Sequence, residues 1–231
     1  MGRVLAAVAA LAIAAVAGIG VWLYLSLDLI VKRSIERYAL EILQAAVEVD
    51  SVKLSPADGA GVLKGLRIGN PKGFRAPHAA TVGTVEIAVD PATVTGDVVL
   101  VRRLVVIAPN ITYEPGNAGS NFDVLQRNVQ RAVGAEGGAA KPGGKSGGRK
   151  LIVETLTIRD ARVNYTPPVG RGAATISFNL PEIQLRNIGK GRGGVTPGEL
   201  AKVILDALAA RIAEAMGRAA LQRGLEGVLK K

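Results

Sequence analysis

Cysteine is absent from this chain of 231 residues, which excludes disulfides, thiolate metal ligands and a cysteine nucleophile. Phe, Trp and Tyr together make up only 3% of the residues. That is too few for the stacking platforms that proteins binding single-stranded nucleic acid usually carry. The chain has one histidine, His78, with no second histidine and no cluster of carboxylates at ligand spacing. The sequence therefore predicts no metal site and no cofactor.

Acidic residues are also few: 19 Asp and Glu stand against 29 Lys and Arg, a net charge of +10. Such a balance favours an anionic partner, and phospholipid, nucleic acid and acidic polymers all fit it. The scarcity of aromatic residues argues against nucleic acid. The composition therefore leaves a phospholipid surface and an acidic polymer as candidate partners.

Catalytic motifs occur only as fragments. Gly144-Lys145-Ser146 resembles the end of a phosphate-binding loop, but Ala139 stands where the first glycine is needed. The same segment matches the nucleophile elbow G-x-S-x-G, which requires a later histidine, whereas His78 comes earlier. The sequence predicts no catalytic residue and no enzyme, and a hydrolase using Ser146 and His78 is the least favoured hypothesis.

Charge is missing from Val4 to Leu27. A helix of that length spans about 36 Å, more than the hydrocarbon core of a bilayer at about 30 Å. We therefore predict a transmembrane anchor over residues 1–27. A cleaved signal peptide is the alternative, although its apolar core is normally only about 7–15 residues long. Basic residues flank the run on both sides, so charge leaves the orientation of the anchor open.

After the anchor, the pattern predicts an α+β fold: an antiparallel sheet with flanking amphipathic helices. Apolar residues first recur at helical spacing and then alternate with a period of two from Val47. Thr196-Pro197-Gly198-Glu199 is a capping box that predicts the start of a final helix. The predicted parts are a juxtamembrane helix (28–46), a β domain (47–195) with a flexible glycine-rich insert (134–149), and a C-terminal amphipathic helix (196–231).

Some predicted strands are apolar on both faces. Such strands need cover from helices, a second sheet or a ligand. Helices that fill one face are one interpretation, and a partly open face that holds acyl chains is the other. The candidate groove residues for the second interpretation are Val85, Ile87, Val89, Val99, Val101, Ile152, Leu156, Ile176 and Phe178.

The order of several short motifs resembles the short AsmA-like proteins. The motifs include K-R-S-I-E-R-Y-A, V-E-V-D-S-V-K-L and V-E-I-A-V-D-P. Members carry a similar N-P-x-G-F loop, here Asn70, Pro71, Gly73 and Phe74, and a similar G-S-N turn into a helix, here Gly119, Ser120 and Asn121. The resemblance implies an inner-membrane anchor with a periplasmic domain in a Gram-negative bacterium. It also implies a curved antiparallel sheet related to the groove of bridge-like lipid-transfer proteins.

Together these observations predict a membrane-anchored periplasmic component that binds or transfers phospholipid in biogenesis of the cell envelope and outer membrane. The chain is too short to span a periplasm by itself, so a homo-oligomer or a protein partner is also expected. The alternative hypothesis is a non-enzymatic scaffold of the envelope that docks a partner through its C-terminal helix.

Overall fold

The computed structural model describes residues 27–117, 119–138, 149–166 and 175–229. A helix over residues 27–43, called here the N-terminal helix, precedes the first strand. The remaining helices are α2 (Asn121–Gly138), α3 (Pro197–Leu229) and the 3-10 turns η1 (Pro91–Thr93) and η2 (Lys190–Arg192). The strands are β1 (Val47–Ser55), β2 (Ala60–Gly69), β3 (His78–Val89), β4 (Val98–Tyr113), β5 (Pro115–Gly116), β6 (Gly119–Ser120), β7 (Lys150–Arg159), β8 (Arg162–Tyr165), β9 (Ile176–Asn179) and β10 (Ile183–Ile188).

The main sheet is mixed, so the prediction of a wholly antiparallel sheet is wrong. Its order is β1-β2-β3-β4-β7-β10, with β8 also beside β4 and β9 outside β8. Both β7 and β8 run parallel to β4, whereas the other neighbours are antiparallel. The reason is that α2 lies between β4 and β7 in the sequence. A helical crossover returns the chain to the same end of the sheet, and the next strand then runs in the same direction.

The predicted transmembrane anchor is corrected as well. Residues 1–26 lie outside the described part, and no helix within that part is long and apolar enough to cross a membrane. The N-terminal helix carries charged residues in every turn. The fold class is accordingly α+β with a mixed sheet and packed helices, and the predicted single-pass location in the bacterial inner membrane is corrected because no described helix could form the span.

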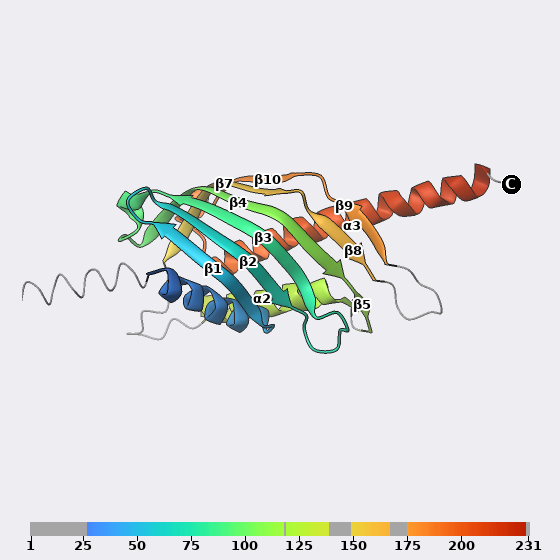
Figure 1. Ribbon diagram of the computed structural model, residues 1–231, viewed down its shortest axis with the longest axis horizontal. Helices are drawn as coiled ribbons and strands as arrows, with labels where there is room; N and C mark the ends of the chain where they lie inside the picture. Colours follow the sequence, from blue (N-terminus) through green and yellow to red (C-terminus); the bar gives the residue numbers. More distant parts are fainter. Residues whose placement is uncertain (1–26, 118, 139–148, 167–174, 230–231) are drawn as a thin grey trace, which may run out of the picture.

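One side of the sheet is apolar and is covered by the helices. Figure 1 shows the N-terminal helix and α2 together along one side of the strands, with α3 passing behind them. Two clusters of buried side chains join the layers. The first contains Val153 and Leu156 of β7 with Leu208 and Ile212 of α3, and the second is built around the N-terminal helix and α2.

A line of irregular backbone crosses the sheet and keeps its apolar residues on the helix side. Gly65, Ala108 and Asp160 have φ angles of 63°, 51° and 56°, and the pairing between neighbouring strands is interrupted at these positions. Side chains in a strand normally alternate between faces with a period of two. Here buried Ile158 is followed by buried Ala161, a step of three residues. We call this line the crease.

The first edge of the sheet is closed by the N-terminal helix. The backbone N–H of Val49 donates to Glu36 at 2.8 Å, and that of Leu54 donates to Asp28 at 3.0 Å. Lys32 donates to the carbonyl of Asp50 at 3.3 Å. An exposed edge strand can pair with other chains through its free backbone N–H and carbonyl groups. The three side chains form hydrogen bonds with such groups of β1 and so make them unavailable for pairing.

Both predicted helix starts are confirmed. Thr196 and Glu199 form the reciprocal bonds of a capping box at 2.7 and 3.1 Å. Ser120 and Asp123 form the same pair of bonds before α2, at 2.7 and 3.1 Å. Each box satisfies two backbone donors that a helix start leaves without a partner.

Candidate functional site

The nine predicted groove residues do not line one open groove. Val101 and Leu156 lie in the core, 2% and 0% exposed, and residues of α3 belong to the same cluster. Ile87, Val89 and Phe178 are partly buried against that cluster. The helices therefore fill the middle of the predicted groove. The other four candidates are half-buried and lie outside both core clusters: Val85, Val99, Ile152 and Ile176.

An opening does exist at the margin of this covered face, between β10 and α3. The cavity, called here the marginal pocket, has a volume of about 550 Å³. That volume lies within the range of about 300–1,000 Å³ that small-molecule sites occupy. Its lining residues are Leu185, Arg186, Asn187, Ile188, Gly189, Gly191, Arg192, Val195 and Val203.

The loop after β10 builds one wall of this pocket. Gly189, Gly193 and Gly194 have φ angles of 81°, 68° and 98°, a region of the backbone map that other residues rarely adopt. A Cβ at Gly189 would lie 2.8 Å from the carbonyl oxygen of Leu151. The loop then pairs Val195 with Leu151 through backbone bonds of 2.7 and 2.8 Å. The tight turn therefore holds the pocket wall against the start of β7.

The marginal pocket combines an apolar floor with basic groups. Leu185 and Ile188 continue the apolar core, and Val195 is 6% exposed. Arg186 and Arg192 are exposed and form no ion pair with any described residue. Arg186 is oriented by hydrogen bonds to the side-chain oxygen of Gln184 at 3.0 and 3.3 Å. An apolar cavity with guanidinium groups among its lining residues suits a ligand with an acyl chain and an anionic head.

None of the residues lining this pocket is among the predicted groove residues. The alternating strand pattern over 183–185 and the run G-K-G-R-G-G before α3 were the available signals. The sequence did not show that α3 would leave this margin of the sheet uncovered.

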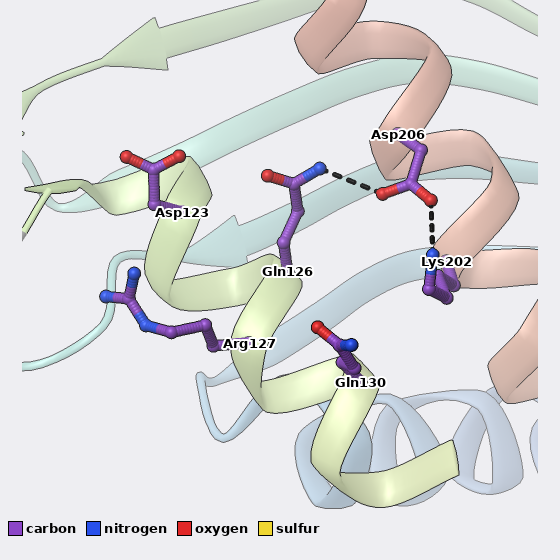
Figure 2. Close-up of a pocket in the computed structure, with 6 residues that line it drawn as sticks. All are labelled: Asp123, Gln126, Arg127, Gln130, Lys202 and Asp206. Atoms are coloured by element: carbon purple, nitrogen blue, oxygen red, sulfur yellow. Dashed lines mark hydrogen bonds and ion pairs between the residues drawn. The ribbon is translucent and has the colours of Figure 1, made fainter. Parts of the chain in front are cut away.

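A second, smaller cavity of about 260 Å³ lies between α2 and α3 and is polar (Figure 2). Figure 2 shows Asp206 of α3 between two partners: Gln126 donates to it at 2.9 Å, and Lys202 pairs with it at 2.5 Å. Asp123 is already engaged in capping α2. These polar groups join the two helices, and their arrangement offers neither a nucleophile with a base nor a carboxylate pair.

The two segments that carry the family resemblance meet in space. The side-chain N–H of Asn121 donates to the side-chain oxygen of Asn70 at 2.7 Å and to the carbonyl of Thr112 at 2.7 Å. The ring of Phe74 lies so close to Gly116 that a Cβ there would come within 2.8 Å of it. The motif residues Asn70, Phe74 and Asn121 thus hold a loop against the end of β4 and the start of α2.

A buried carboxylate anchors the same loop. Glu114 is 3% exposed and accepts hydrogen bonds from the backbone N–H of Arg75 at 2.9 and 3.1 Å and of Ala76 at 3.0 Å. The guanidinium of Arg75 adds a contact of 3.3 Å. Burial by itself would raise the pKa of Glu114, but the backbone donors of Ala76 and Arg75 and the Arg75 side chain together lower it below its usual value. Its polar atoms are satisfied, so this cluster is structural.

The weaker candidates gain no further support. His78 opens β3 opposite Gly69, whereas the segment with Ser146 lies outside the described residues. In the described ranges, no three His, Cys, Asp or Glu side chains gather as a metal site would require. No model of a known protein family matches the chain, and no curated protein matches it either.

Proposed function

We propose that this chain is a lipid-binding protein that places an acyl chain in the marginal pocket and an anionic headgroup at Arg186 and Arg192. The observation that carries the proposal is the pocket itself, which continues the apolar core at Leu185 and Ile188 and is also lined by two arginines free of ion pairs among the described residues. The proposal extends to transfer of the bound lipid to another acceptor during biogenesis of the cell envelope.

Three physical contributions to binding favour a lipid with an anionic headgroup as the ligand. Each methylene removed from water contributes about 0.8 kcal/mol, so an acyl segment gains affinity from an apolar floor without polar partners. A guanidinium binds phosphate or carboxylate through paired hydrogen bonds, which an ammonium cannot reproduce. The basic net charge of +10 adds a long-range attraction for anions.

The test compares two substitutions on α3. Val203 lines the marginal pocket, whereas Ala210 is exposed on the same helix. Native mass spectrometry and titration with fluorescent phosphatidylglycerol would follow binding to the delipidated full chain. Val203→Asp should weaken binding at least about tenfold, because a carboxylate in an acyl site is costly. Ala210→Asp should bind as the wild type does, and circular dichroism would verify that both variants fold.

Headgroup recognition needs a separate comparison. Arg186→Glu combined with Arg192→Glu should weaken phosphatidylglycerol more than phosphatidylcholine. The absence of saturable lipid binding by the wild type, or equal binding by Val203→Asp and Ala210→Asp, would refute the proposal.

A second candidate function is a scaffold that docks a partner through α3. Among the residues of α3 whose side chains the structure describes, Met216 is the last that packs on the core, and the helix continues to Leu229. Figure 1 shows this end of α3 projecting beyond the sheet. The extra 13 residues amount to about 20 Å of helix. Truncation after Arg218 distinguishes the two functions, because it should remove partner capture while leaving phosphatidylglycerol binding intact.

A further inference from the structure

The N-terminal helix exposes three large apolar side chains. Leu29, Ile30 and Leu40 are 48%, 45% and 51% exposed. They are three of the four large apolar side chains that are exposed in the described part of the chain, and the fourth is Val94. A single exposed leucine is ordinary, but a group of them on one element indicates a contact surface.

Helical geometry places these residues on one face together with arginines. At about 100° per residue, Leu29, Arg33 and Leu40 project within about 40° of one another, and Ile30 and Arg37 lie next to them. Arg33 and Arg37 are exposed and form no ion pair with any described residue. We call these five residues the outer face of the helix.

The helix cannot rotate to bury this face. Outside this face, Asp28 and Glu36 hold the backbone of β1, and Ile42 and Leu43 are 6% and 7% exposed in the core. Turning the helix by half a turn would break both hydrogen bonds and expose the two core side chains. These contacts therefore keep the outer face exposed on the protein surface.

We propose that the outer face docks on the surface of an anionic lipid bilayer. A convex strip of Leu and Ile interspersed with Arg matches the boundary between headgroups and acyl chains, where the apolar groups are buried and each arginine meets a phosphate. A purely apolar partner surface would leave Arg33 and Arg37 buried without anions, which is costly. This docking is independent of the marginal pocket.

The absence of cysteine makes a local test possible in the full chain. Leu40→Cys, labelled with an environment-sensitive fluorophore, reports on the outer face. Val94→Cys is the matched control, since Val94 is 38% exposed on a different element. Phosphatidylglycerol vesicles should shift the emission of the label at position 40 to the blue, phosphatidylcholine vesicles should do so much less, and the label at position 94 should not respond.

Charge reversal tests the role of the arginines. Arg33→Glu with Arg37→Glu should raise the lipid concentration needed for half of the shift at least about tenfold. The control pair, Arg159→Glu with Arg162→Glu, changes two exposed arginines on the sheet and should leave it unchanged. Val203→Asp should also leave the shift unchanged, which separates this docking from lipid binding in the marginal pocket.

Three results would overturn the docking. The label at position 40 could stay unchanged while the chain sediments with vesicles, which would assign binding to another segment. Equal shifts at positions 40 and 94 would show adsorption without a defined face. A label at position 40 that is already shielded without vesicles would show that residues 1–26 or a second copy of the chain covers the face.

Discussion

Replacement of Glu114 by glutamine should reveal how strongly one buried carboxylate holds the motif loop. The carboxylate accepts backbone N–H groups from Arg75 and Ala76 at 2.9–3.1 Å and is 3% exposed. In Glu114→Gln, an amide NH₂ must replace one of the two accepting oxygens. It then faces a backbone donor, and the charge that strengthened the remaining bonds is lost. Hydrogen bonds to a charged group contribute about 1.5–3 kcal/mol each, so we expect a loss of about 3 kcal/mol in the free energy of unfolding.

The pH dependence gives this prediction its sharpest form. Because the folded-state pKa of Glu114 is lowered, its contribution is fully present above the unfolded value of about 4.3. The contribution is lost as the pH falls through the folded pKa. The glutamine variant has no such proton to bind. The stability difference between wild type and variant should therefore be largest near pH 7 and should shrink in acid.

Urea unfolding followed by circular dichroism at a series of pH values would measure this difference. Glu154→Gln makes the same chemical change at an exposed position of β7 and should alter stability by less than about 0.5 kcal/mol. If Glu114→Gln is as stable as the wild type at pH 7, or if its deficit is the same at pH 7 and pH 3, the reasoning about the carboxylate is wrong.

Two further predictions concern the sheet. Gly65→Ala should lower the midpoint of urea unfolding, because φ there is 63° and the new Cβ would lie 1.9 Å from a carboxylate oxygen of Asp50. The control is Gly83→Ala, where the new Cβ would come no nearer than 3.9 Å to any neighbour. Equal unfolding midpoints for the two variants would contradict backbone strain at the crease. The combined variant Asp28→Ala and Glu36→Ala should leave the N–H groups of Val49 and Leu54 without their acceptors. The edge of β1 could then pair with other chains, and light scattering should show increased concentration-dependent association. Unchanged scattering would show that these two hydrogen bonds do not prevent association.

Sequence patterns predicted the elements better than their arrangement. Capping chemistry is local, so Thr196 with Glu199 marked the start of α3 correctly. Strand direction is not local. Nothing in the residues of β7 states that it pairs with β4 and runs parallel to it, since that pairing depends on where α2 packs.

The crease also explains why side-chain faces were hard to predict. A period of two assigns Ile158 and Ala161 to opposite faces, yet both are buried on the helix side because Asp160 has a positive φ angle. Aspartate is one of the few non-glycine residues that adopt this conformation without a large cost, so its identity was a weak signal. Ala108 gave no such signal, and neither residue revealed that the irregular positions would align across strands.

The bonds between the N-terminal helix and β1 have a consequence for the accuracy of folding. Neighbouring N–H groups of a regular strand point to opposite edges, so the N–H groups of Val49 and Leu54, five residues apart, would face opposite edges if β1 were regular. Both donate to the N-terminal helix, and the pairing of β1 with β2 is interrupted between them, at Asp50 and Gly65. The two carboxylates, eight residues apart in the sequence, therefore fit a strand that bends at the crease, and a β1 without this irregularity would offer only one of the two donors to its first helix.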